Sequence, residues 1–165
     1  MITAEKQSDR HMTVRLSGQA LALAERHVVE SVPKELGGVL VGWWEGHDTV
    51  VVHDFLIVPD HSAGWNHYDR VHKLADDLLV TYIRDAGDPR LGYVGEWHSH
   101  PAPQPPSATD RSALSSIARQ SQSPVALVVL AVTSTSEVVA HALIGRVRWP
   151  RRTAIRPATV ERMDP

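Results

Sequence analysis

The chain contains no cysteine among its 165 residues. Disulfide bonds, thiolate ligands for zinc and a cysteine nucleophile are therefore all excluded. A metal ion bound by this protein has to be held by histidine, carboxylate and water. The chain has ten histidines, and two of them, His98 and His100, stand one residue apart.

A long apolar run is also absent. The longest apolar stretch, residues 124–132, is about as long as a strand and far shorter than the roughly 20 residues that cross a bilayer. Residues 1–12 carry charged side chains and no apolar run of the kind found in a signal peptide. We therefore expect a cytoplasmic protein that does not bind membranes.

A strong excess of one charge sign is missing as well. The formal net charge is -2, so the sequence predicts no global electrostatic attraction to nucleic acid. Hydrophobic residues make up 42% of the chain, which is ordinary for a folded soluble protein. A chain of this length has room for one domain with a proper core, and its sequence leaves the oligomeric state unknown.

The spacing of apolar residues predicts the order strand, helix, hairpin, helix, strand, helix and hairpin. Strands are expected at residues 14–16, 39–44, 49–58, 91–98, 125–132 and 138–144, and helices at residues 18–31, 67–86 and 107–119. Because strands joined by short turns pair antiparallel, this order predicts one α/β domain with a mixed, largely antiparallel sheet flanked by helices.

The two ends of the chain are predicted to lie outside this domain. The domain is expected to span residues 13–145, and residues 1–12 form a polar, flexible lead-in. Residues 146–165 contain six arginines together with Pro150 and Pro157. This composition breaks the strand pattern, so a solvated or disordered tail is expected.

The segment from Gly95 to Asp110 is the most informative part of the sequence. Side chains alternate along a strand, so His98 and His100 project to the same side. Zinc is bound well by neutral imidazole and one carboxylate, with an open position for water. Asp110 can supply that carboxylate from the first turn of the next helix. Prolines in residues 101–106 restrict the loop and lower the cost of ordering it.

Each half of this pattern also has a purely structural interpretation. A His-x-His pair by itself is weak evidence for a metal site. Ser107 and Asp110 by themselves are typical of a helix N-terminus, with the serine as cap and the aspartate near the positive end of the helix dipole. The two interpretations are compatible, since Ser107 can cap the helix and still face a metal ion.

The combined motif resembles that of the JAMM metallopeptidases, also called MPN+ or JAB. Their signature is an upstream glutamate, then His-Ser/Thr-His-Pro, then Ser-x-x-Asp. This chain has Glu35 in Glu-x-Gly-Gly, His98-Ser99-His100-Pro101 and Ser107-Ala108-Thr109-Asp110. The Gly-Glu-Trp-His-Ser-His-Pro segment looks like the stand-alone bacterial branch.

The resemblance covers about residues 13–145 and implies a single-domain MPN/JAB-like fold of the cytidine-deaminase-like kind. Six residues separate the second histidine from the serine, one fewer than in the best-known eukaryotic form. This departure shortens the loop and leaves the spacing within Ser-x-x-Asp unchanged.

The resemblance also implies a role for each matched residue. The ligands of one Zn²⁺ per chain would be His98, His100 and Asp110. Glu35 would be the general base, and Glu96 competes for that role because it lies on the same strand face as His98. Ser107 would donate a hydrogen bond to the developing oxyanion.

By the same resemblance we expect a zinc-dependent metallopeptidase or isopeptidase that cleaves after the C-terminal glycine of a ubiquitin-like protein or its conjugate. Stand-alone domains of this kind occur with E1- and E2-like partners, including in antiphage defence systems. A second hypothesis with the same active site is processing of small sulfur-carrier proteins in cysteine or cofactor biosynthesis. A third is a non-catalytic MPN scaffold, which predicts lost metal ligands, whereas this chain retains the whole set.

Overall fold

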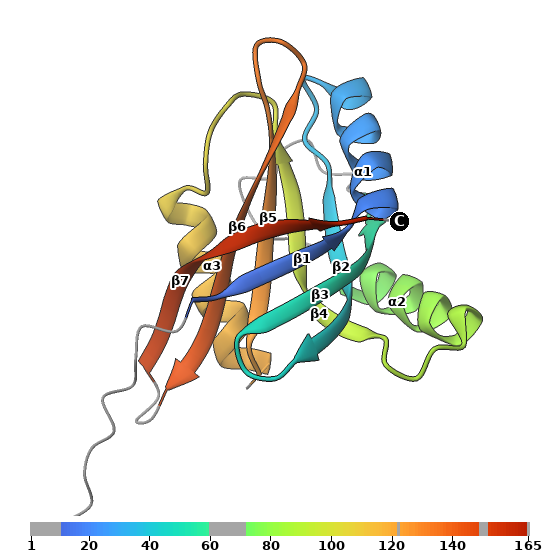
Figure 1. Cartoon of the computed structure of the whole chain (residues 1–165), viewed down its shortest axis with the longest axis vertical. Helices are drawn as coiled ribbons and strands as arrows, with labels where there is room; N and C mark the ends of the chain where they lie inside the picture. The colour runs from blue at the N-terminus through green and yellow to red at the C-terminus, as the bar shows by residue number, and fades with distance from the viewer. Residues whose placement is uncertain (1–10, 60–71, 122, 149–151, 165) are drawn as a thin grey trace, which may run out of the picture.

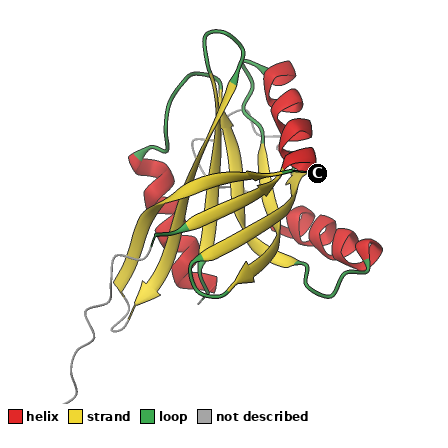
Figure 2. Ribbon diagram, viewed as in Figure 1, coloured by secondary structure: helices red, strands yellow, loops and turns green. Residues whose placement is uncertain are grey.

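The structure is a computed structural model that describes residues 11–59, 72–121, 123–148 and 152–164. These residues form three helices and seven strands (Figure 1; Figure 2). In chain order the elements are β1 (Thr13–Ser17), α1 (Gly18–Ser31), β2 (Gly37–Glu45), β3 (Thr49–Ile57), α2 (His72–Ala86), β4 (Gly92–His100), α3 (Ala108–Ser121), β5 (Val125–Val132), β6 (Val138–Arg148) and β7 (Arg152–Met163). All except β7 lie close to the predicted positions.

The seven described strands close into a barrel in the order β1-β3-β2-β4-β5-β6-β7. Three neighbouring pairs, β1–β3, β1–β7 and β4–β5, are parallel, and the other four are antiparallel. The prediction of one α/β domain with a mixed sheet is confirmed. The description of a sheet flanked by helices is wrong in that the sheet closes into a barrel, because β1 bridges β3 and β7 and so joins the two edges of the sheet (Figure 1).

The predicted tail is also wrong for residues 152–163, which form β7. This strand pairs antiparallel with β6 and parallel with β1. Pro157 is tolerated for a local reason. The pairing with β1 begins only at Thr159, so no described strand pairs with that edge of β7 at the proline. A strand accepts proline where the missing N–H is not needed.

Helix α1 packs against the inward side chains of the barrel. Its N-terminus is capped as predicted, because the Ser17 side chain accepts the Ala20 N–H at 3.4 Å. Leu21 and Val28 belong to the same buried cluster as Trp97 on β4. Trp97 and Ser99 of β4 therefore lie on the inward face, while Glu96, His98 and His100 alternate with them and lie on the outer face.

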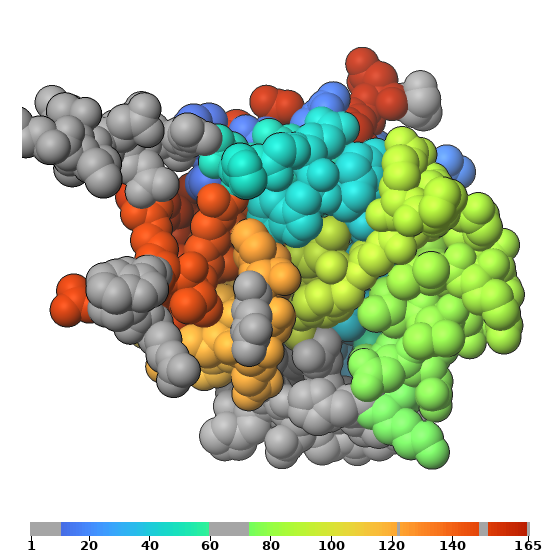
Figure 3. Space-filling model, turned by 90° about the horizontal axis from the view of Figure 1, so that it is seen from below, coloured from blue at the N-terminus to red at the C-terminus, as the bar shows by residue number. Residues whose placement is uncertain are grey.

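Helices α2 and α3 cover the outer face of the sheet, on opposite sides of the face seen in Figure 3. Leu114 of α3 packs against Leu127 and Val129 of β5, while Leu78 of α2 packs in the cluster around Val39 of β2. Strand β4 lies between β2 and β5. Its outward side chains are therefore flanked by two helices. No described helix is long and apolar enough to cross a bilayer.

A bulge interrupts β4 just before the histidines. Val94 is an extra residue, because its neighbours Tyr93 and Gly95 pair with adjacent residues of β2. An extra residue shifts the alternation of side chains along the strand. Tyr93 consequently lies on the same face as Glu96, three positions further on.

Candidate metal centre

His98 and His100 occupy the end of β4, and both are buried. Their Nε2 atoms lie 3.2 Å apart, as the predicted alternation requires. Pairing on both sides fixes the backbone here, since His98 lies opposite Gly37 of β2 and Val129 of β5. Gly37 has no side chain, so nothing from β2 competes with His98 for the outer face.

Asp110 reaches the two imidazoles from the first turn of α3. Its Oδ1 is 3.1 Å from His98 Nε2, and its Oδ2 is 3.6 Å from His100 Nε2. The same carboxylate accepts the Ser107 N–H at 2.6 Å, while Ser107 Oγ accepts the Asp110 N–H at 3.1 Å. This reciprocal cap fixes the first turn of the helix. Capping and metal-site geometry therefore occur together in this motif.

The Gln104 carbonyl determines which nitrogen of His100 faces the cluster. His100 Nδ1 lies 2.8 Å from the Gln104 oxygen. A carbonyl only accepts hydrogen bonds, so Nδ1 carries the proton. In the neutral imidazole, Nε2 then keeps its lone pair and directs it at the cluster. The short loop after His100 thus directs Nε2 of this side chain toward His98 and Asp110.

The donor set and its spacing fit a zinc ion. Bond lengths of about 2.0–2.2 Å in a tetrahedral site place ligand atoms roughly 3.3–3.6 Å apart. The separations among His98, His100 and Asp110 are 3.1, 3.2 and 3.6 Å. The three residues form a candidate site for a metal ion, in which all ligand atoms lie within 4.8 Å of one another. Three protein ligands are the number found in catalytic zinc sites, in which water or substrate takes the fourth position.

The charge of Asp110 also suits a cation. Burial alone disfavours the ionised carboxyl group, but hydrogen bonds with His98 and Ser107 outweigh it. They hold the pKa of Asp110 well below its usual range. The carboxylate is therefore ionised at neutral pH although it is buried.

Glu35 lies in the segment that leads into β2, beside β4. Leu36 donates its N–H to Ser99 Oγ and accepts the Ser99 N–H, both at 2.8 Å. These bonds hold Leu36 beside Ser99, one position beyond Gly37 and His98, the last pair of the β2–β4 ladder. If the same register continued, Glu35 would stand opposite His100. Directly opposed side chains share a face. The register therefore predicts that the half-buried Glu35 lies on the side of the sheet that carries the histidines.

Glu96, the competing candidate for the base, is buried on the same strand as His98. Its Oε1 accepts a hydrogen bond from the Tyr93 hydroxyl at 2.9 Å. Within the described residues, by contrast, the Glu35 carboxylate has no hydrogen-bond partner. A carboxylate already bound to a neighbour is less available to take a proton from water.

Two participants in this arrangement were not predicted from the sequence. Gln104 contributes only a backbone carbonyl, which every residue type has, so its identity gives no signal. Tyr93 lies an odd number of positions from Glu96, and strict alternation predicts opposite faces for the pair. Only a bulge at Val94 would have indicated their contact.

The fold and the site together define a JAB-type domain. A profile of the prokaryotic homologues of the JAB domain matches residues 18–154, and the chain belongs to this family. The chain is similar to the solution structure of protein DSY2949 from Desulfitobacterium hafniense, with a TM-score of 0.67 and 16% identity over 92% of this chain and 94% of that one. That likeness concerns the fold alone. A comparison with curated proteins gave no match.

Proposed function

We propose that the protein is a zinc-dependent metallopeptidase of the JAMM type. The observation that carries the proposal is the buried convergence of His98, His100 and Asp110 at separations that fit zinc. When bound, zinc supplies Lewis-acid chemistry: it polarises a carbonyl group and makes a water molecule more acidic. A non-catalytic scaffold does not need these three side chains to meet.

The protein's own residues carry the proton transfers and the stabilisation of charge. Glu35 takes the proton of the attacking water and returns it to the leaving amine. The Ser107 hydroxyl oxygen accepts the Asp110 N–H but keeps its own hydrogen, which it donates to the developing oxyanion. One such donor lowers the barrier by about 3–4 kcal/mol.

The substrate that we propose is a ubiquitin-like protein, or its conjugate, cleaved after the C-terminal glycine. Membership of the JAB family supports this class of substrate. E1- and E2-like proteins are the partners expected to make such conjugates. Small sulfur-carrier proteins are the second substrate class, and they require the same active-site residues.

The proposal is tested with the zinc-loaded protein and a ubiquitin-like protein fused through its C-terminal glycine to a reporter. We expect cleavage at the fusion junction, loss of cleavage on treatment with a zinc chelator, and its return when zinc is added back. Mass spectrometry of the products identifies the bond, and a serine-protease inhibitor serves as a control that leaves the rate unchanged. Cleavage that continues after zinc has been removed contradicts the proposal.

Replacing Ser99 by alanine tests how Glu35 is positioned. The Leu36 N–H loses its acceptor and becomes unpaired in a part-buried place, which loosens the segment that holds the base. We expect the zinc content to stay unchanged and kcat to fall about tenfold, since a small misplacement of a catalytic group is costly. Ser116→Ala is the matched control, because among the described residues that hydroxyl bonds only to the Ser112 carbonyl within α3. Equal kcat in the two variants would show that Ser99 does not position Glu35.

A further inference from the structure

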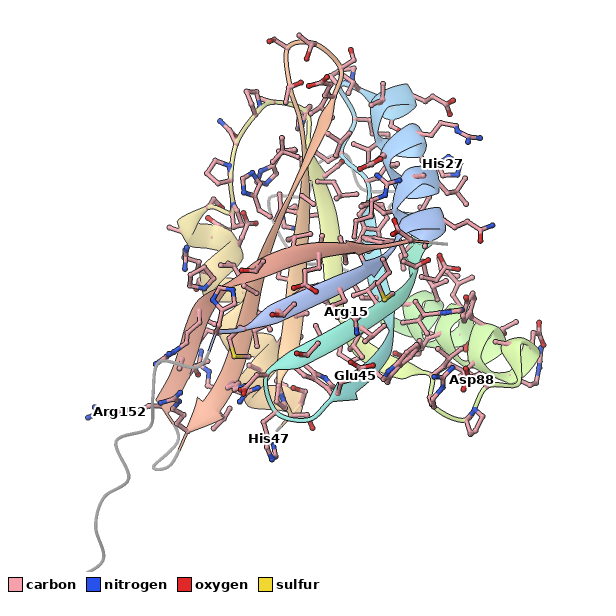
Figure 4. All side chains as sticks on the ribbon, in the orientation of Figure 1. Arg15, His27, Glu45, His47, Asp88 and Arg152 are labelled. Carbon is pink, nitrogen blue, oxygen red and sulfur yellow. The ribbon has the colours of Figure 1, made fainter. Side chains whose placement is uncertain are left out.

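A second recess lies away from the metal centre, between α1 and α2. It is a groove of about 660 Å³. One wall comes from Ala20, Leu23 and His27 of α1, the other from Leu78, Thr81 and Tyr82 of α2, and the floor from residues 54–57 of β3. Figure 4 labels His27 on α1 and so marks the first wall. The recess is mostly apolar, as a site for a polypeptide or an organic ligand usually is.

The floor of the groove is the edge of a strand. Successive side chains of a strand point to opposite faces, so four consecutive residues can line one groove only through their backbone edge. The pairing of β3 with β1 ends at Val52, which lies opposite Leu16. Beyond Val52, β3 has no strand partner on that side within the described part of the chain.

The backbone groups at this edge can be assigned from the β2–β3 pairing. The Val58 N–H donates to Gly37 at 2.9 Å, so alternate residues of β3 bond to β2. Phe55 and Ile57 are the intervening residues, and they direct their backbone groups away from β2. Asp54 Oδ1 accepts the Phe55 N–H at 2.8 Å. Within the described residues, the Phe55 carbonyl and the N–H and carbonyl of Ile57 bond to no other strand.

The charge at the groove favours a basic partner. No described Lys, Arg or His pairs with the Asp54 carboxylate. Burial, together with a hydrogen bond to Asp54 and its charge, raises the pKa of Tyr82 to about 12. The neutral Tyr82 hydroxyl therefore leaves the negative charge of Asp54 uncompensated, and a cation from outside the protein would be attracted there.

We propose that this groove binds an extended polypeptide segment, which adds as a strand to the free edge of β3. Its apolar side chains alternate into the walls formed by α1 and α2, and a lysine or arginine lies near Asp54. Main-chain hydrogen bonds to Phe55 and Ile57 hold the segment, and the pockets beside them select its side chains.

The bound segment would lie close to the metal centre without being part of it. Ile57 is opposite Gly38, which is opposite Trp97 of β4. With strands about 4.8 Å apart, an added strand lies roughly 14 Å from the strand that carries the histidines. One substrate can therefore occupy both sites. This last step rests on the proposed peptidase function, whereas peptide binding itself does not.

The test uses a fluorescent peptide of valine and threonine with one central lysine, capped at both ends, and fluorescence polarisation with the purified full chain. Two analogues carry N-methyl groups on one or the other alternate set of backbone amides. Because only one set faces β3, we expect the two analogues to differ in affinity by about tenfold or more. Zinc-loaded and chelated protein should bind the parent peptide equally. If the protein fails to cleave the ubiquitin-like fusion, the peptide-binding result therefore still stands.

Two protein variants locate the binding. Thr81→Trp, at an exposed position in the groove wall, should reduce affinity for the parent peptide about tenfold or more, while Val80→Trp should leave it unchanged. Val80 is the neighbouring residue on α2, is 64% exposed and does not line the groove. Equal affinity for the two methylated analogues, or no effect of Thr81→Trp, would overturn the proposal. A wild-type dimer that Thr81→Trp dissociates, without peptide binding, would also overturn it and assign the groove to a second copy.

Discussion

Replacing Asp110 by asparagine is expected to remove zinc from the protein and, with it, nearly all turnover. Asparagine has the size of aspartate and an oxygen that can still accept the Ser107 N–H, so the cap of α3 is largely kept. It lacks the negative charge that the hydrogen bonds of this site stabilise. We expect the zinc content to fall from about one per chain to a small fraction, and kcat/KM to fall at least about a thousandfold, or about 4 kcal/mol.

The measurements are metal analysis after gel filtration and the fusion-cleavage assay, with circular dichroism to confirm that the variant is folded. Asp76→Asn is the matched control, because it makes the same chemical change at an exposed position of α2. It should alter neither zinc content nor turnover. An Asp110→Asn protein that is folded, retains zinc and cleaves at the normal rate would mean that this carboxylate is not a ligand.

Glu35→Gln is expected to separate metal binding from chemistry. Glutamine fills the same space but cannot take a proton from water. Zinc should stay at about one per chain, KM should change little, and kcat should fall by roughly 10²–10⁴-fold. Metal analysis and steady-state kinetics on the same preparation decide the result.

Glu96→Gln is the informative comparison for this second variant. Its amide oxygen can still accept the Tyr93 hydroxyl, so the buried contact is retained. We expect a much smaller loss of kcat than for Glu35→Gln. The opposite pattern, with full activity for Glu35→Gln and none for Glu96→Gln, would assign the proton transfer to Glu96.

The convergence of His98, His100 and Asp110 could be predicted because each contribution is local. Strand alternation alone puts the two histidines on one face. The helix-cap spacing puts the aspartate in the first turn of α3, and both are confirmed. The bounds of α1 and its cap at Ser17 followed from the same kind of short-range pattern. The roles of these residues in catalysis stay predictions.

Closure of the barrel could not be predicted in this way, because it depends on pairing between the two ends of the chain. β1 lies between β3 and β7, and nothing in the sequence near Thr13 or Thr159 indicates that partnership. Pro157 indicated that this segment is not a strand. In the structure it lies on β7 before Thr159, where β7 pairs with β6 but not yet with β1. The hydrophobic pattern of a strand specifies which of its faces is buried. It does not specify which other strands pair with it.

The free edge of β3 was not predicted from the sequence, for a related reason. Residues 49–57 have the composition of a strand throughout, whereas the pairing with β1 stops at Val52 because β1 ends at Ser17 and the chain continues as a helix. The residue at which a strand stops being paired depends on the length of the neighbouring strand. That information lies in the packed structure and not in the segment itself.

The central claim is that two imidazoles and one carboxylate hold a single metal ion. The most direct measurement is X-ray diffraction at the zinc absorption edge from crystals of the zinc-loaded protein. The account predicts one anomalous peak per chain, at about 2.0–2.2 Å from His98 Nε2, His100 Nε2 and an Asp110 oxygen. Crystals grown with excess zinc that show no peak among these three side chains, or in which Asp110 points away from both histidines, would contradict it.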